Sequence, residues 1–140
     1  MNWLYKGKPL FDVPEDKPYG FAYRITYSND KKYIGKKAFF SQIKKPFGKR
    51  ELKEVIDKRL KRYKVIIKES NWKKYKGSHH TAENLIIAKK EILEMCNDKL
   101  NLTYAEMKHQ VLNNILTDDD YINISIAGKY FRGRIDEQRN

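Results

Sequence analysis

Arg59 is the residue whose position in the sequence points most directly to chemistry. Residues 51–63 have apolar side chains at helical spacing, and a rotation of about 100° per residue places Arg59 in the middle of their arc. The arc is formed by Leu52, Val55, Ile56, Leu60 and Tyr63. An arginine on a buried stripe is costly unless it is paired or faces a ligand site. Two interpretations therefore stay open, an ion pair with a core carboxylate and a ligand-binding site.

Positive charge is concentrated around this predicted helix. The chain has 30 Lys and Arg against 18 Asp and Glu, a net charge of +12. Residues 36–68 contain thirteen of the basic residues and three acids, and thirteen minus three leaves +10 in this stretch. Such a surface favours a polyanion, most often a nucleic acid, over the alternatives of an acidic protein partner or a merely solubilising surface. The expected nucleic-acid contacts are Lys37, Lys44, Lys45, Lys49, Arg50 and Arg62.

Length and composition indicate a domain count and a compartment. A chain of 140 residues fits one domain, residues 1–140. Cys96 is the single cysteine, which excludes an intramolecular disulfide and favours a reducing compartment. No apolar run approaches the roughly 18 residues of a membrane span, and no apolar signal core follows Met1. We therefore expect a cytoplasmic protein without a membrane partner.

Hydrophobic periodicity predicts the elements that must position the chemistry. Alternation over residues 21–27, turn residues at 28–30 and an apolar run at 32–35 predict an antiparallel hairpin over 20–36. Further predicted elements are a helix over 51–63, a short helix over 81–88, a strand over 91–96, a helix that begins at Thr103 and an extended segment over 121–126. The last helix has its apolar positions at Tyr104, Val111, Leu112 and Ile115.

The order of these elements predicts an α+β fold. We expect a small antiparallel or mixed three-stranded sheet flanked by helices, in the order β-β-α-α-β-α. Residues 1–19 form an extended leader in this prediction, residues 37–49 a basic insertion and residues 127–140 a basic tail.

Two short motifs on the predicted hairpin carry a resemblance to a known family. Phe21-Ala22-Tyr23 is followed, after nine residues, by Tyr33-Ile34-Gly35. The pair resembles the GIY-YIG nuclease superfamily, although Phe21 and Ala22 replace the usual glycine and isoleucine. The resemblance is strongest with stand-alone, phage-encoded Seg-like homing endonucleases, which share the residue patterns at 5–9, 69–78 and 104–106.

The resemblance implies a metal-dependent endonuclease that hydrolyses phosphodiester bonds in DNA to 5′-phosphate and 3′-hydroxyl ends. By this resemblance Glu106 holds Mg²⁺ or Mn²⁺ and Arg59 contacts the scissile phosphate. Family members place this arginine about two turns after the second motif, so the longer spacing here makes residues 37–49 an insertion. Thr103 and Glu106 also have the spacing of a capping box, which is the alternative role for the glutamate.

The other site residues follow from the same resemblance. Tyr23 or Tyr33 positions or deprotonates the water, and Lys36 lowers the cost of that phenolate. Tyr63 orients the water or the phosphate, and the supporting residues are Gly35 and Asn123. The expected partners are DNA and, for double-strand cleavage, a second copy of the chain in a homo-oligomer. A non-catalytic nucleic-acid-binding module with the same fold is the alternative function.

Two remaining groups of residues favour structural roles. His79 and His80 with Cys96 lack the spacing of a zinc site, because adjacent histidines rarely coordinate one ion well. Trp72 and Tyr75 could stack on bases, but we expect them to pack under the turn at Gly77.

The helical arc yields a prediction about the arginines. Arg59→Ala should abolish DNA cleavage by removing stabilisation of the transition state, whereas Arg50→Ala should mainly weaken DNA affinity. Cleavage rates and binding titrations of the two variants measure these effects. Near wild-type cleavage by Arg59→Ala, or an essential Arg50, would contradict the assignment.

Overall fold

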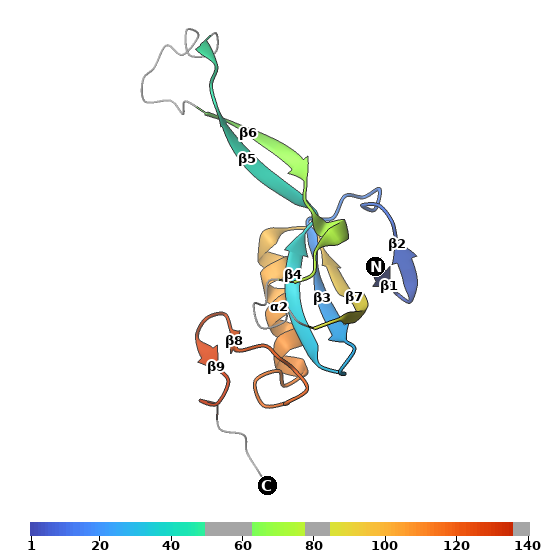
Figure 1. The fold of residues 1–140 in the computed structure, drawn as a ribbon. Coiled ribbons are helices and arrows are strands. Elements are labelled where there is room, and N and C mark those ends of the chain that lie inside the picture. Colours follow the sequence, from blue (N-terminus) through green and yellow to red (C-terminus); the bar gives the residue numbers. More distant parts are fainter. Residues whose placement is uncertain (50–62, 78–84, 136–140) are drawn as a thin grey trace. The chain divides into compact units, whose positions relative to one another are not determined.

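The structure is a computed structural model that describes residues 1–49, 63–77 and 85–135. The chain forms two compact units, Met1–Phe39 with Asn71–Asn140 and Phe40–Ser70. We call the first unit the body and the second the ribbon unit (Figure 1).

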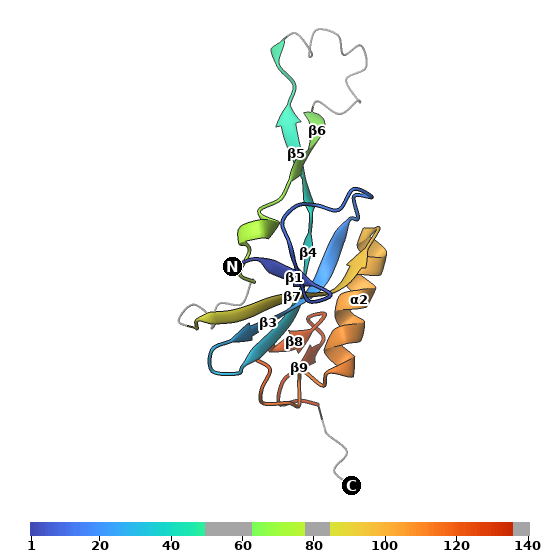
Figure 2. The ribbon, with the colours of Figure 1, turned by 90° about the vertical axis from the view of Figure 1, so that its right-hand side faces the viewer.

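The body contains a mixed sheet of five strands. Its order is β2-β1-β7-β3-β4, and its members are β1 (Trp3–Tyr5), β2 (Lys8–Leu10), β3 (Gly20–Tyr27), β4 (Lys32–Ala38) and β7 (Ile87–Cys96). β3 is antiparallel to both β4 and β7, whereas β1 is parallel to β7 and lies beside it (Figure 2). The predicted hairpin is confirmed. The prediction of three strands is wrong, because the leader contributes β1 and β2 to the sheet.

The ribbon unit contains a second, two-stranded sheet. β5 (Phe40–Pro46) pairs antiparallel with β6 (Tyr63–Glu69). The predicted loop over 37–49 is thus largely strand, and Tyr63 begins β6 instead of ending a helix. Residues 50–62 of the predicted helix lie outside the described residues. Of the predicted helix over 81–88, residues 87 and 88 belong to β7, and 81–84 lie outside the described part.

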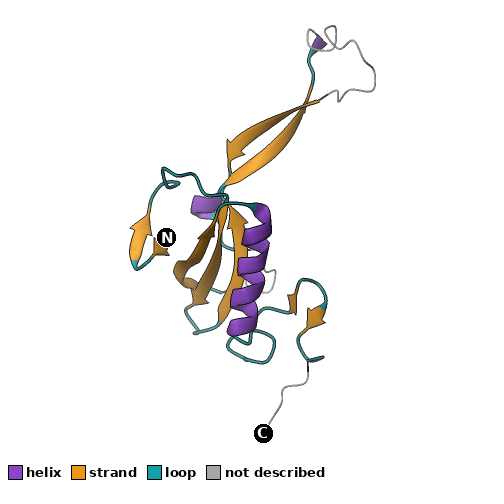
Figure 3. Cartoon of the chain, turned by 180° about the vertical axis from the view of Figure 1, so that it is seen from behind, coloured by secondary structure: helices purple, strands orange, loops and turns teal. Residues whose placement is uncertain are grey.

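The remaining elements are short, apart from one helix. They are the 3-10 helix η1 (Trp72–Lys74), the helix α2 (Lys99–Leu112), and the two-residue strands β8 (Ser125–Ile126) and β9 (Tyr130–Phe131). α2 lies across one face of the body sheet (Figure 3). The basic tail over 127–140 therefore includes β9, and its last five residues lie outside the described part of the chain.

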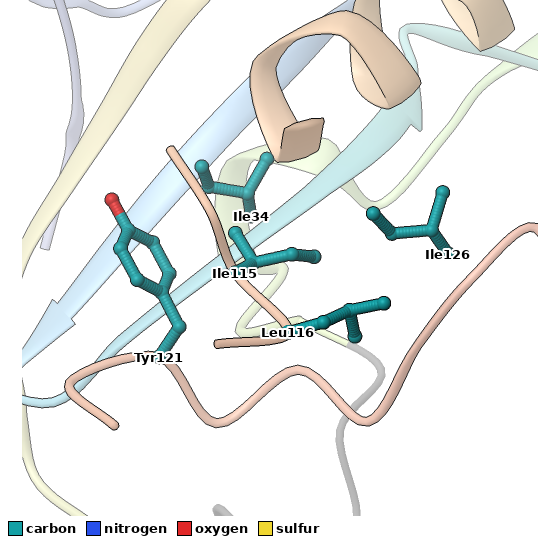
Figure 4. Close-up of a cluster of buried hydrophobic side chains, with 5 residues drawn as sticks. All are labelled: Ile34, Ile115, Leu116, Tyr121 and Ile126. Carbon is teal, nitrogen blue, oxygen red and sulfur yellow. The ribbon is translucent and has the colours of Figure 1, made fainter. Parts of the chain in front are cut away.

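Apolar side chains fill both faces of the body sheet. On the α2 side, one cluster joins Ala22, Cys96, Leu102 and Ala105. A second cluster joins Ile34, Ile115, Leu116, Tyr121 and Ile126 (Figure 4). An aromatic cluster of Trp3, Phe21, Phe39 and Trp72 has ring centroids 5.0–6.3 Å apart. The Trp3 indole also donates to the carbonyl oxygen of Trp72 at 2.6 Å. Trp72 is therefore buried, as a packing role requires, and its ring partners are those of this cluster.

The face that α2 buries differs from the sequence prediction. Its buried residues are Leu102, Ala105 and Gln110, whereas Tyr104, Val111 and Leu112 are exposed. The helix also begins four residues before Thr103, and Asp98 caps it by accepting from the Asn101 N–H at 2.7 Å. The sequence prediction placed the larger apolar side chains against the sheet. Close contact with the sheet instead favours the small Ala105 and Gln110. The Gln110 amide donates to the Ile34 carbonyl oxygen.

The outer edge of β4 is closed by the chain after α2. Asn123 is buried, accepts from the Ile34 N–H at 3.0 Å and donates to the Ile34 carbonyl at 2.8 Å. Lys32 hydrogen-bonds through its backbone to Asp120 and Ile122. This segment therefore satisfies β4 where no further strand of the body sheet pairs with it.

Close approach of the backbone at Gly20 gives a stability prediction. Gly20→Ala should lower the free energy of unfolding by about 1–3 kcal/mol, because an added Cβ would lie 2.5 Å from the Lys37 carbonyl oxygen. Gly48→Ala is the matched control, since no described atom lies within 4 Å of a Cβ there, and its effect should stay within about 0.5 kcal/mol. Urea denaturation measures both values. Equal stability of the two variants would show that β3 can shift to admit a methyl group.

Candidate active site

The second motif of the hairpin brings its glycine against the tyrosine of the first. Tyr23 on β3 lies directly opposite Gly35 on β4. A Cβ added to Gly35 would lie 2.6 Å from the Tyr23 hydroxyl oxygen and 3.1 Å from a ring carbon of Tyr33. Because Gly35 has no side chain, the Tyr23 phenol can lie across β4. The ring centroids of Tyr23 and Tyr33 are 6.2 Å apart.

Tyr75 is the third tyrosine of this cluster. Its side chain is hydrogen-bonded to Tyr23, and the two ring centroids are 6.0 Å apart. The Lys90 ammonium donates to the Tyr75 carbonyl oxygen at 2.6 Å, which fixes the Tyr75 backbone to β7. Gly77 follows at a φ of +89°, and a Cβ added to it would lie 3.7 Å from the Tyr23 hydroxyl oxygen. The sequence prediction assigned Tyr75 only a packing role, and the signal for more was its place in the segment shared with the Seg-like relatives.

Burial determines what the Tyr23 phenol can do. Its side chain is only 1 % exposed, and burial raises the pKa of Tyr23 far above its ordinary value. The nearby Tyr75, Tyr33 and Glu106 side chains raise this pKa further. Tyr23 is therefore a neutral phenol that holds its neighbours in place. Tyr33 is half-buried and is the more accessible of the two motif tyrosines.

Lys36 and Glu106 form the charged part of the site. Lys36 follows Gly35 on β4, and its ammonium donates to the Thr103 hydroxyl of α2 at 2.9 Å. Glu106 lies about 40° around α2 from the buried Leu102, so it belongs to the helix face that packs on the sheet. Burial raises the pKa of Glu106, and the charge of Lys36 opposes that rise.

The capping-box alternative for Glu106 is wrong. Asp98 caps the helix, and the Thr103 hydroxyl binds Lys36 instead of a backbone N–H. Within the described residues, the Glu106 carboxylate accepts no hydrogen bond and forms no ion pair. The described chain also contains no group of three or more His, Cys, Asp or Glu that could share a metal ion. A cation held here would therefore have Glu106 as its carboxylate ligand.

Lys37 is a further lysine of β4, and it lies on the side of the sheet that carries the tyrosines. Its ammonium lies 4.3 Å from the centroid of the Tyr75 ring, and burial lowers its pKa. Neighbouring residues on a strand point to opposite faces. Lys36 therefore lies on the α2 side of the sheet and Lys37 on the side of the tyrosines. Lys37 was predicted to contact nucleic acid, and its place beside Tyr75 is compatible with that role.

The other predicted site residues belong to the far edge of the body sheet, to the ribbon unit or to segments outside the described chain. Asn123 supports the site from the far edge by holding the Ile34 backbone, next to Gly35. Tyr63, Lys44 and Lys45 belong to the ribbon unit, where the Lys44 ammonium lies 4.8 Å from the Tyr63 ring centroid. Lys49 follows β5. The predicted residues Arg50, Arg59, Arg62, His79 and His80 lie outside the described residues.

Comparison with known proteins identifies the family. A family model described as "Putative endonuclease segE, GIY-YIG domain" matches residues 3–126. No match was found among curated proteins or among solved structures. No helix in the described part of the chain is long and apolar enough to cross a membrane. The matched span includes every element of the cluster around Gly35, from β3 to α2. The chain therefore belongs to the SegE family of GIY-YIG endonuclease domains.

Proposed function

We propose that this protein is a metal-dependent endonuclease that hydrolyses DNA to 5′-phosphate and 3′-hydroxyl ends. The observation that carries the proposal is the Glu106 carboxylate, which is half-buried near Lys36 and has no protein partner among the described residues. Its charge also acts on the Tyr23 phenol, whose pKa it raises. Family membership supports nuclease chemistry. The cytoplasm of a host cell, if the chain is phage-encoded, is the proposed place of action.

Glu106 is suited to hold a hard divalent cation. A partly desolvated carboxylate gains from a cation, and Mg²⁺ or Mn²⁺ commonly binds one or two carboxylates and completes its shell with water and substrate phosphate. When bound, the cation supplies charge to stabilise the phosphate as negative charge accumulates on it. The Lys36 ammonium is hydrogen-bonded to Thr103, about one helical turn before Glu106, and so supplies a second positive charge near the Glu106 carboxylate.

The tyrosines have different proposed roles. Tyr23 stays neutral and positions Tyr75 and Tyr33, because burial and the nearby Tyr75, Tyr33 and Glu106 side chains all raise its pKa. Tyr33 is the accessible phenol, and we assign to it the orientation or deprotonation of the attacking water. This division narrows the sequence prediction, in which either motif tyrosine could act on the water.

Residues outside the cluster complete the proposal by family resemblance. Arg59 would contact the scissile phosphate through its planar guanidinium, and Tyr63 would orient water or phosphate. One such site cuts one strand at a time, so a double-strand break would use a second copy of the chain or two successive cuts.

Glu106→Gln tests the metal role. The variant should lose DNA cleavage in Mg²⁺ by about 10²-fold or more and retain DNA binding, because the amide keeps the shape and loses the charge that binds the cation. Glu94→Gln is the control, since the Glu94 carboxylate pairs with Lys108 and His109, and its cleavage should stay near wild type. Nicking of supercoiled plasmid with and without Mg²⁺ measures both. Binding without any Mg²⁺-dependent cleavage by the wild type would instead support a non-catalytic DNA-binding module.

Tyr33→Phe tests the role of the accessible phenol. Its cleavage rate should fall by about 10²-fold, the contribution of a general acid–base group, while DNA affinity and melting temperature remain unchanged. Tyr104→Phe removes a hydroxyl from a side chain that is 65 % exposed on the outer face of α2, and it should cleave normally. Single-turnover cleavage and thermal unfolding give the two readouts. A normal rate for Tyr33→Phe would reduce this residue to a packing role.

A further inference from the structure

The register of the ribbon unit separates its side chains onto two faces. In an antiparallel pair, residues directly opposite one another point to the same face, and the faces alternate along each strand. One face carries the pairs Ser41–Lys68, Ile43–Ile66 and Lys45–Lys64. The other face carries Phe40–Glu69, Gln42–Ile67, Lys44–Val65 and Pro46–Tyr63. We call the first the lysine face and the second the apolar face.

The two faces differ in charge. The lysine face has Lys45, Lys64 and Lys68 and no acidic residue, which gives it three positive charges. On the apolar face the charges of Lys44 and Glu69 cancel. The Lys44 ammonium also lies over the Tyr63 ring on that face. The net positive charge of the paired strands β5 and β6 is therefore concentrated on one face.

The lysine face also has a small apolar centre. Ile43 is 36 % exposed, and its cross-strand partner Ile66 is half-buried. Lys45 and Lys64 flank this pair on one side, and Lys68 flanks it on the other. Apolar contact at the centre with cations around it is suited to a partner that has uncharged groups between two rows of anions.

We propose that the lysine face of the β5–β6 ribbon lies in the major groove of duplex DNA. The proposal rests on the proposed DNA endonuclease function, and it identifies a part of the chain that binds the duplex. Two strands lie about 4.8 Å apart, so a two-stranded ribbon enters the roughly 12 Å major groove and is too wide for the roughly 6 Å minor groove.

The geometry assigns each part of the lysine face to a part of the groove. Lys45 and Lys64 lie on opposite strands, so their ammonium groups reach phosphates on opposite walls. Ile43 and Ile66 face the floor, where thymine methyl groups offer apolar contact. A-form RNA has a deep, narrow major groove that does not admit such a ribbon, so duplex DNA is favoured over duplex RNA.

A salt titration tests the charged contacts. Binding is measured on the Glu106→Gln background, which keeps the DNA uncut, with random-sequence duplex DNA at four salt concentrations. Replacing Lys45, Lys64 and Lys68 with glutamine should lower the slope of log affinity against log salt by about 2.7, or about 0.9 per phosphate. The arginine version of the same triple variant should restore the slope. An unchanged slope in the glutamine variant would overturn the proposal.

A matched control removes the same charge from the body. Lys8, Lys99 and Lys129 are exposed, and their replacement with glutamine should change the slope by less than one unit. A slope reduced equally by both triple variants would show a general charge effect and overturn the ribbon's role. Equal affinity of the wild type for duplex RNA, or binding of an acidic protein with no binding of DNA, would do the same.

Groove-specific ligands test the placement. Methyl green and netropsin are both cations, but the first occupies the major groove and the second the minor groove. Methyl green should displace the protein from DNA, and netropsin should not; the reverse result would overturn the major-groove assignment. Plasmid cleavage by the wild type in Mg²⁺ is measured in parallel. Cleavage with an unchanged salt slope would refute the ribbon proposal alone, whereas DNA binding without cleavage would refute the proposed enzyme function alone.

Discussion

The structure of the body depends on the contact of the Tyr23 phenol with the backbone of β4 at Gly35. The phenol occupies the space that any other side chain at position 35 would fill, since a Cβ there would lie 2.6 Å from its oxygen. This contact fixes the register of β3 against β4, because a shift by one residue would bring a side chain under the ring. It also presents the hydroxyl to Tyr75, so the chain after η1 is joined to β3. The second motif thus needs its glycine for packing as well as for any chemistry.

The outer edge of β4 is fixed by side-chain hydrogen bonds to its backbone. Ile34 precedes Gly35, and its backbone groups bind the amide side chains of Asn123 and Gln110. Arg132 then donates to the Tyr121 and Asn123 carbonyls at 2.7 and 2.9 Å, so the segment that carries Asn123 is itself fixed. The hydrogen bonds to Ile34 are buried, and an unpaired backbone group is costly in such a place. The strand that carries Lys36 is therefore restrained from both sides, which suits a group that must stay close to Glu106.

The sequence was most informative where local pattern and packing agree. The β3–β4 hairpin alternates clearly, and the motif residues Tyr23, Gly35, Lys36 and Glu106 lie within one cluster of the body. β1 and β2 were not predictable, because three-residue strands show no period and β1 is stabilised by distant β7. The predicted buried face of α2 was wrong, because contact with the sheet favours small and hydrogen-bonded residues over large apolar ones. In the ribbon unit the strands were missed because Val65, Ile66 and Ile67 form an unbroken apolar run without the alternation that marks a strand.

Both edges of the body sheet have features that hinder strand addition, although by different means. At β2 the outermost strand is three residues long and contains Pro9, which has no N–H to offer a further strand. At β4 the segment around Asn123 occupies the hydrogen-bonding groups of Ile34 and Lys32. A sheet protected in this way resists the edge-to-edge pairing that leads to aggregation and amyloid. The same features hinder a peptide or another copy of the body from adding a strand beside β2 or beside Lys32 and Ile34 of β4.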